Sequence, residues 1–173
     1  MPRQDAVSPQ PALLGFLMAR PRHGSELYQE LSRELGRVWE LGLSKLYAEL
    51  NQLEEAGLVE PQTEPQSGRP ARKVYHLTPE GRAVFLEWVR QPTPYLRHIR
   101  VEFLARLYFF RRLSLDGLDE AVARQQAVCR AQIERFEQLA GEADDAFRRC
   151  VLEFRRGQLE AVVHWLDRCL EIL

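Results

Sequence analysis

Apolar residues recur at helical spacing in a central stretch of the chain, residues 43–57. On a helix that turns by about 100° per residue, four leucines form one narrow apolar stripe. They are Leu43, Leu46, Leu50 and Leu53. The opposite face carries small or hydrogen-bonding side chains, especially near the N-terminal end. A helix held by one stripe, with such groups at its leading end, can enter the major groove of DNA. The alternative is an ordinary amphipathic helix packed on a small sheet.

Two short extended runs follow this helix, at residues 58–60 and 73–77. Gly57 is placed to end the helix. The sequence between the two runs contains Pro61, Pro65 and Pro70, which exclude a central strand there and predict a loop. Arg69, Arg72 and Lys73 make this segment the most basic patch of the N-terminal half. The pattern predicts a recognition helix followed by a β-hairpin wing.

The segments around this unit complete a helix-turn-helix outline. A helix at about residues 12–19 is apolar nearly all round and should be buried or pack against a second subunit. A second helix at about residues 25–35 has one leucine-rich face. After the wing, Thr78 is placed as an N-cap, with Pro79 at the first helical position and Glu80 in the first turn. The proline-rich segment 91–94 ends this helix. We therefore expect a DNA-binding domain over residues 1–94.

Residues 95–173 are expected to form an all-helical domain. One helix runs from about residue 99 to 113, and Asp116 can cap the next. The seam of that second helix comprises Leu118, Val122, Gln125, Cys129, Gln132 or Ile133, Phe136 and Leu139. The seam of the last helix comprises Phe147, Val151, Phe154, Gln158, Ala161 or Val162, Trp165, Cys169 and Ile172. Long helices with one apolar stripe each favour a partner surface, most simply a second copy of the chain. The alternative is an antiparallel hairpin that closes on itself and on the third helix.

Composition narrows the function classes. The chain has 173 residues and a formal net charge of −1, so any nucleic-acid binding must use local basic patches. Its three cysteines form no CxxC pair and are expected to be reduced, buried thiols. The histidines are scattered, and no GxSxG, phosphate-binding loop or HExxH motif occurs. We expect no catalytic site, no metal and no cofactor. Because no uncharged stretch is long enough for a membrane span, we expect a cytoplasmic protein.

Three blocks of sequence together resemble the PadR family of bacterial transcriptional regulators. They are ALLGFLMARPRHGSEL, LSKLYAELNQLEEAGLVE and GRPARKVYHLTPEGR, and the resemblance is continuous over about residues 12–88. The later segment RVEFLARLYFFRRL resembles the start of the C-terminal helical domain of the longer PadR proteins. The resemblance implies a winged helix-turn-helix repressor that dimerises through its C-terminal helices and releases DNA when a small molecule binds.

The resemblance also assigns roles to segments. Residues 43–56 become the recognition helix and residues 69–73 the wing. Two positions depart from the pattern: Ser25 stands where many relatives have tyrosine, and Ala48 where many have proline. The operator sequence therefore cannot be borrowed from relatives.

The expected fold is mainly α with a small β-hairpin: a winged helix-turn-helix domain followed by an all-helical dimerisation domain. The expected partners are double-stranded DNA with a palindromic operator, a second copy of the chain, and a small aromatic or hydrophobic effector. The candidate DNA-binding residues are Ser44, Lys45, Tyr47, Ala48, Asn51, Arg69, Arg72 and Lys73. The candidate effector-pocket residues, between the two domains, are Trp39, Phe103, Tyr108 and Trp165.

A winged-helix adaptor is the alternative function. Such a protein would bind another protein, rather than DNA, through the same helix and wing. Glu49, Glu54 and Glu55 support it, because they put acids near the proposed groove face. A gel shift with genomic fragments at low salt distinguishes the two functions.

Overall fold

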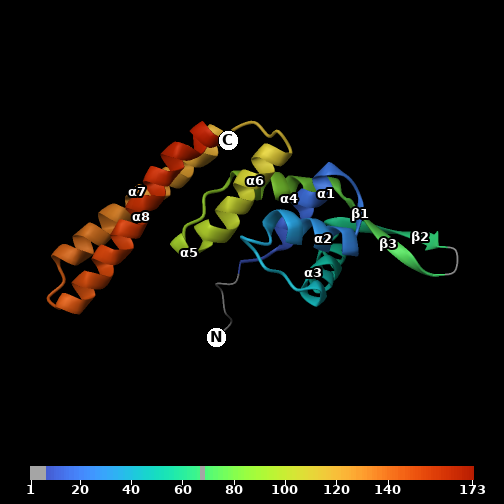
Figure 1. Cartoon of the computed structure of the whole chain (residues 1–173), viewed down its shortest axis with the longest axis horizontal. Helices are drawn as coiled ribbons and strands as arrows, with labels where there is room; N and C mark the ends of the chain where they lie inside the picture. The colour runs from blue at the N-terminus through green and yellow to red at the C-terminus, as the bar shows by residue number, and fades with distance from the viewer. Residues whose placement is uncertain (1–6, 67–68) are drawn as a thin grey trace.

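The computed structural model describes residues 7–66 and 69–173, and it is mainly helical with one small antiparallel sheet (Figure 1). This confirms the predicted fold class. The N-terminal elements are α1 (Gln10–Ala19), β1 (Arg22–His23), α2 (Gly24–Leu35), α3 (Leu43–Glu55), β2 (Val59–Gln66), β3 (Arg69–Leu77) and α4 (Pro79–Arg90). The C-terminal elements are α5 (Leu96–His98), the π-helix η1 (Ile99–Phe103), α6 (Leu104–Arg112), α7 (Leu118–Gly141) and α8 (Ala146–Ile172).

Helix α1 is the centre of the N-terminal core. Its six residues 12–17 are all buried, because the helix is apolar on every side and is surrounded by α2, α3, α4 and the sheet. Leucines of α2 and α3 pack against it, as the helical spacing predicts. The expectation of a buried first helix is confirmed.

The sheet is larger than the sequence predicts. Its strand order is β1-β3-β2, and both pairs are antiparallel. The predicted loop after residue 60 is wrong in part, because β2 continues to Gln66 and Pro61 pairs with Tyr75 inside it. Proline is tolerated there because β2 is an edge strand, whose outer side needs no ladder hydrogen bonds. The two-residue strand β1 was not predicted, since nothing local marks it.

Helix caps explain where several elements begin. The Thr78 hydroxyl accepts a hydrogen bond from the Gly81 N–H at 3.0 Å, as predicted for an N-cap. Asp116 does not cap α7: Gly117 holds that position with a φ of 90°, a left-handed conformation that favours glycine. At the next helix, α8, the carboxylate of Asp145 is the N-cap and accepts a hydrogen bond from the Arg148 N–H at 2.6 Å.

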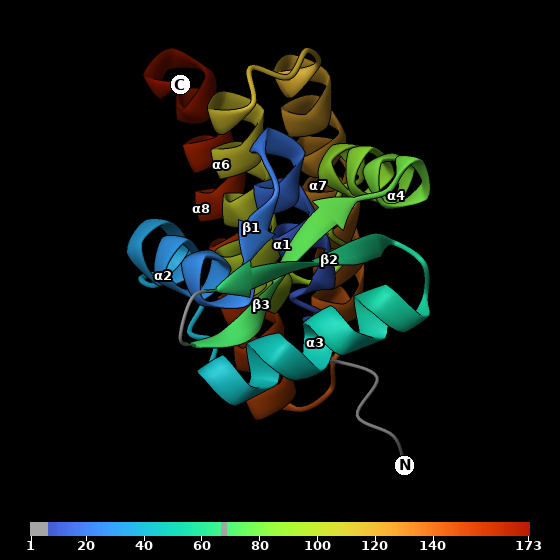
Figure 2. The ribbon, with the colours of Figure 1, turned by 90° about the vertical axis from the view of Figure 1, so that its right-hand side faces the viewer.

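Helices α7 and α8 form an antiparallel hairpin, called the arm here, at the opposite end of the molecule from the wing β2–β3 (Figures 1 and 2). The arm closes through Leu152, Leu159 and Leu166, which are spaced seven residues apart and buried against α7. The predicted seam of α7 is confirmed in its buried Val122, Gln125 and Cys129.

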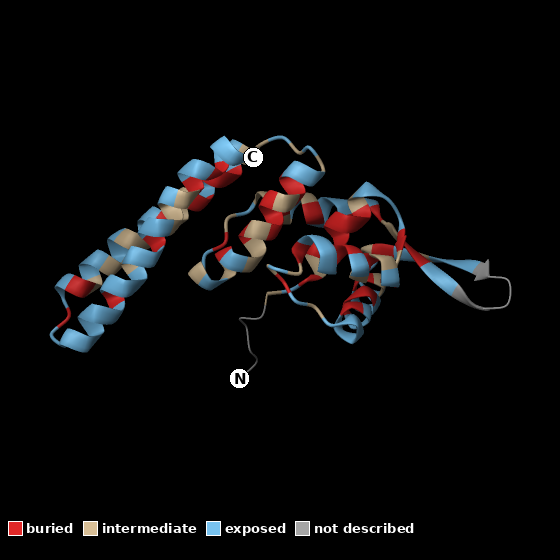
Figure 3. Cartoon of the chain, in the orientation of Figure 1, coloured by how far each residue is buried: buried red, intermediate tan, exposed pale blue. Residues whose placement is uncertain are grey.

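The predicted seam of α8 is only partly covered. In its C-terminal half, Trp165 and Cys169 meet the chain's own helices, and the Trp165 ring lies 6.5 Å from that of Phe103, whereas Ile172 is 68% exposed. Its N-terminal half is exposed: Phe147 is 75% and Phe154 64% accessible, with Val151 between them. In Figure 3, most of the arm has the colour of exposed residues. The two helices therefore do close on each other as an antiparallel hairpin, the alternative given above, but through Leu152, Leu159 and Leu166. The arm still presents an exposed apolar face.

The linker between α4 and α5 is hydrogen-bonded to helices α6 and α7. The fully buried Gln125 of α7 accepts a hydrogen bond from the Thr93 N–H at 2.8 Å and donates one to the Thr93 carbonyl at 3.0 Å. About two turns further along α7, Gln132 donates a hydrogen bond to the Pro94 carbonyl. Arg106 of α6 donates to the Gln91 carbonyl at 2.6 Å. These bonds fix the path of the linker between the winged part and the arm.

Helix α6 packs into the N-terminal core, although it lies beyond residue 94. Ala105, Phe109 and Phe110 belong to the same buried cluster as α1 and α4. Phe109 is fully buried, with its ring centroid 5.2 Å from that of Phe16 and 5.3 Å from that of Phe85. The functional division at residue 94 stays a prediction, while the hydrophobic packing continues across it.

The cysteines are free thiols, and two of the three are buried. Burial raises the pKa of the thiols of Cys129 and Cys169. Cys150 is exposed, so the expectation of a buried thiol is wrong there, because this residue lies on the outer side of α8. Among the helices that the structure describes, none combines the length and the apolar character needed to cross a bilayer.

Two glycines give opposite predictions for stability. A Cβ at Gly15 would lie 2.6 Å from Phe85 and 2.7 Å from Phe109, whose buried rings have no room to move, so Gly15→Ala should destabilise the fold by about 1–3 kcal/mol. A Cβ at Gly157 would meet no described atom within 4 Å. Gly157→Ala should stabilise α8 by about 0.5–1 kcal/mol. Denaturant unfolding at one protein concentration measures both changes. If both substitutions shifted the free energy of unfolding in the same direction, the result would contradict this packing.

Candidate nucleic-acid interface

Helix α3 is held from one side and exposed on the other. Leu46, Leu50 and Leu53 are fully buried, as the stripe predicts. Leu43 is 45% exposed, so its assignment to the stripe is wrong: it lies in the first turn of α3, directly after the N-cap Gly42. The predicted contact residues of α3 are all exposed. They are Ser44, Lys45, Tyr47, Ala48 and Asn51.

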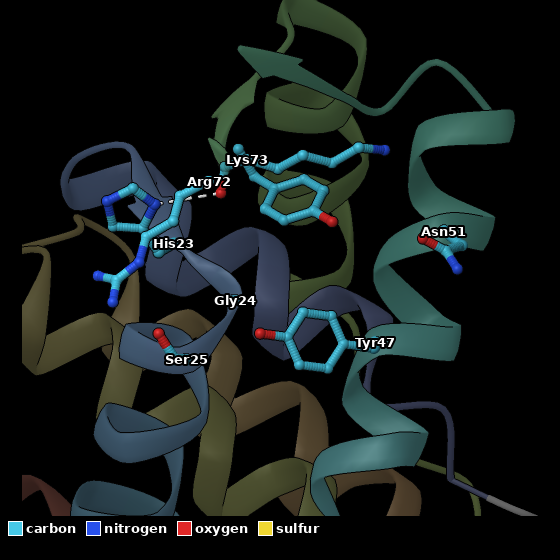
Figure 4. A pocket seen from close by; sticks show the side chains of 8 residues that line it. His23, Gly24, Ser25, Tyr47, Asn51, Arg72 and Lys73 are labelled. Carbon is cyan, nitrogen blue, oxygen red and sulfur yellow. Dashed lines mark hydrogen bonds between the residues drawn. The ribbon is translucent and has the colours of Figure 1, made fainter. Parts of the chain in front are cut away.

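A hollow of about 410 Å³ lies between α3, the start of α2 and strand β3 (Figure 4). It brings together four of the eight predicted DNA-binding residues: Tyr47 and Asn51 from α3, and Arg72 and Lys73 from β3. Ser44, Lys45 and Ala48 lie on the exposed face of α3 outside this lining. Arg69 lies in β3, and its side chain falls outside the described part of the structure.

The other lining residues are His23, Gly24, Ser25 and Tyr75. Of these, only Ser25 was singled out from the sequence, as a departure from the PadR pattern. A hydrogen bond of 3.2 Å joins Nδ1 of His23 to the carbonyl oxygen of Lys73 and fixes the start of α2 on the wing. Gly24 lets the Tyr47 ring approach closely, because a Cβ there would lie 2.5 Å from that ring and would push it aside. The His-Gly-Ser turn was visible in the sequence, but its contact with residues 47 and 73 depends on strand pairing over long range.

Both lysines of this surface are paired with glutamates of α3. Lys45 Nζ lies 2.5 Å from Glu49 Oε1, and Lys73 Nζ lies 3.0 Å from Glu54 Oε2. The hydrogen bond that Lys73 donates to Glu54 raises the pKa of Lys73, which therefore stays charged at neutral pH. Within the described residues, no ion pair forms at the exposed Arg72. The surface thus carries cations that are partly neutralised from within the chain.

The placement of Glu49 differs from the expectation that it lies near the groove face. Its side chain is buried, and Gln10 of α1 donates a hydrogen bond to its Oε2 at 2.8 Å. Nothing near residue 49 in the sequence announces this contact, since the two residues are 39 positions apart. Glu49 therefore anchors α3 to α1, while Glu54 and Glu55 remain at the surface side of the helix.

Known protein families match two segments of the chain. The model of the transcriptional regulator PadR-like family matches residues 13–87, which contain the whole hollow, and that of the C-terminal region of virulence activator alpha matches residues 99–173. The negative transcriptional regulator PadR of Bacillus subtilis is 26% identical over 173 residues, which cover 94% of this chain and 95% of the relative. Residues 13–87 therefore form a PadR-like domain of the kind found in these transcriptional regulators.

Other relatives and structures resemble this PadR-like chain. A probable transcriptional regulator of Mycobacterium tuberculosis is 32% identical over 81 residues, covering 47% of this chain and 43% of its own. The crystal structure of B. subtilis PadR in complex with operator DNA has a TM-score of 0.49 and 22% identity, covering 95% of this chain and 97% of that one. The structure of the same protein with p-coumaric acid covers the same shares, with a TM-score of 0.45 and 22% identity.

The predicted effector residues of this PadR-like chain fall into two separate clusters. Trp39 and Tyr108 pack with the N-terminal core, whereas Phe103 and Trp165 pack between η1 and the arm. A larger hollow, of about 800 Å³, lies between the linker and the arm. Phe136, Leu139 and Leu152 give it an apolar wall, and its rim includes Arg135 and Arg155. The four-residue effector site stays a prediction.

Proposed function

We propose that this PadR-like regulator is a repressor that binds an inverted-repeat operator as a homodimer and releases it when a small molecule binds. One observation carries the proposal: the exposed face of α3 and the basic wing residues open onto the same hollow. When α3 enters the major groove of a duplex, the Asn51 amide can pair with an adenine edge, and Lys45 can reach guanine or phosphate. Arg72 and Lys73 would lie along the backbone.

The homodimer is proposed from the uncovered stripe of α8. Phe147, Val151 and Phe154 are exposed residues in the first turns of α8. This end of α8 lies away from the wing (Figure 1). Exposed aromatic residues in a row favour a partner surface, and a two-fold axis is the commonest way for one chain to supply it. Two copies related by that axis present two recognition helices in opposite directions, which predicts the inverted repeat.

Release by a small molecule is proposed from what the relatives bind. B. subtilis PadR, which this chain matches over nearly its whole length, has been solved with operator DNA and with p-coumaric acid. We take a small aromatic or hydrophobic compound as the effector class, bound near Trp39, Phe103, Tyr108 or Trp165. Such a compound induces release only if it binds the DNA-free form more tightly. The proposal includes no catalytic activity and places the protein in the cytoplasm.

Replacing Lys45 and Arg72 together with alanine tests the DNA-binding face. Affinity for a promoter fragment should fall about tenfold or more, and the slope of log affinity against log salt should flatten by about 0.9 for each phosphate contact removed. Fluorescence anisotropy between low and moderate salt measures both quantities. The matched control replaces Arg111 and Arg124, exposed arginines of α6 and α7, and should leave both unchanged. Unchanged affinity and slope in the Lys45 and Arg72 variant would overturn the assignment of this face.

The adaptor alternative rests on the acids of α3, two of which neutralise the lysines of the surface. A regulator should retard at least one fragment of the source genome in a gel shift at low salt, where phosphate binding is strongest. If no fragment is retarded, the adaptor function is favoured and the repressor is excluded.

A further inference from the structure

We propose that Glu54 competes with DNA phosphate for Lys73 and so limits sequence-independent binding by this surface. The inference rests on the proposed DNA-binding function. The Lys73 ammonium donates to both carboxylate oxygens of Glu54, at 3.0 Å to Oε2 and 3.2 Å to Oε1. A phosphate that takes over these hydrogen bonds must displace the carboxylate. Glu54 therefore acts as a counter-ion that the chain carries itself.

The position of Lys73 makes it the residue for which this competition matters. It belongs to β3, its carbonyl oxygen is bonded to His23, and its side chain extends across the hollow toward α3 (Figure 4). The ammonium thus links the wing to the recognition helix at the place where the proposal puts the duplex backbone. Half of the Lys73 side chain is exposed (50%), so a phosphate can reach it.

The Glu54 carboxylate can move away from its lysine, unlike the carboxylate of the second lysine pair of the surface. The Glu49 carboxylate beside Lys45 is 5% exposed and is held by Gln10, so it cannot leave without breaking a buried contact. The Glu54 carboxylate is 31% exposed, and Lys73 is its hydrogen-bond and ion-pair partner in the described part of the chain. A solvent-exposed ion pair contributes little to stability and exchanges readily. Glu54 can therefore give way to phosphate, whereas Glu49 stays in place.

The competition has a definite electrostatic consequence. Sequence-independent binding comes almost entirely from cations that replace the counterions condensed on DNA. A lysine that must first give up its own carboxylate contributes less to this exchange. Non-specific binding has no base contacts to offset the loss, so the wild-type chain should bind unrelated duplexes weakly and with a shallow dependence on salt.

Glu54→Gln tests the inference, because glutamine keeps the shape of the side chain and removes its charge. Affinity for an unrelated duplex should rise about threefold to tenfold for a dimer with two such sites, and the salt slope should steepen by up to about 0.9 per site. The matched control is Glu55→Gln, which makes the same change in net charge one residue further along α3 and should have a smaller effect. The full chain is used throughout, and its circular dichroism checks the fold of each variant.

A double-mutant cycle separates competition from a general charge effect. In a Lys73→Gln background, Glu54→Gln should no longer tighten binding, because the contested ammonium is gone. The inference is overturned if Glu54→Gln binds no more tightly than Glu55→Gln, or if its full effect persists in the Lys73→Gln background. Wild-type protein that binds no duplex at all, specific or unrelated, would overturn the proposed function itself. The two failures are therefore distinguishable.

Discussion

Replacing Phe147 and Phe154 together with aspartate is expected to convert the homodimer into monomers. Burial of one such aromatic side chain contributes about 1.5–3 kcal/mol. A two-fold interface would contain both residues from each copy, so the loss should exceed about 4 kcal/mol, or about a thousandfold in the dimer dissociation constant. In the single chain both side chains are mainly exposed, so the fold of the monomer should survive because neither supports its core.

The loss of the dimer should also weaken operator binding. Two linked recognition helices bind two half-sites with a high effective concentration, which a monomer lacks. Sedimentation velocity measures the state of association, and anisotropy with an operator fragment measures the binding. The control is Val84→Asp, which puts one aspartate on an exposed apolar position of α4 and should leave the dimer intact. A double variant that is still dimeric at the same concentration would show that the stripe is not the interface.

Phe109→Ala is expected to destabilise the protein by about 3–5 kcal/mol, because the cavity would form where four rings meet. The Phe109 ring lies 5.1 Å from Tyr108, 5.2 Å from Phe16, 5.3 Å from Phe85 and 6.4 Å from Trp88, measured between ring centroids. It joins α6 to α1 and α4, so the loss should be felt by the DNA-binding elements as well as by the C-terminal helices.

Urea unfolding at a fixed protein concentration measures this loss, with two optical probes. The control is Val84→Ala, a truncation at an exposed position, which should change stability by no more than about 0.5 kcal/mol. Because the buried cluster crosses residue 94, fluorescence and circular dichroism should report one shared transition. A loss of about 1 kcal/mol or less for Phe109→Ala, or two well-separated transitions in the wild type, would contradict the packing of α6 into the first core.

Local rules predicted the elements well where the decisive information is local. The start of α4 follows from Thr78, Pro79 and Glu80, and its cap geometry is confirmed. The buried stripe of α3 follows from helical spacing alone. Local rules failed where a distant partner decides: β1 exists because β3 is there to pair with it, and β2 passes through Pro61 because it is an edge strand.

The same distinction applies to the candidate site. Tyr47, Asn51, Arg72 and Lys73 could be proposed from the sequence because a polar helix face and a basic hairpin are visible there. The pairing of Lys73 with Glu54 could not, since it requires the wing to fold back onto α3. The burial of Glu49 likewise depends on Gln10, which sequence spacing cannot place beside it. Charge counts in a segment do not show which charges neutralise one another.

The linker between α4 and α5 is recognised through its peptide groups. Gln125, Gln132 and Arg106 bind the backbone of residues 91, 93 and 94, and none of these bonds uses a linker side chain. The side chain of Thr93 is buried, so other residue types of similar size could present the same N–H and carbonyl at this position. An inserted or deleted residue would instead move these groups out of reach of glutamines fixed on a rigid helix. Among relatives that keep these three side chains, the linker should vary in sequence and hold its length.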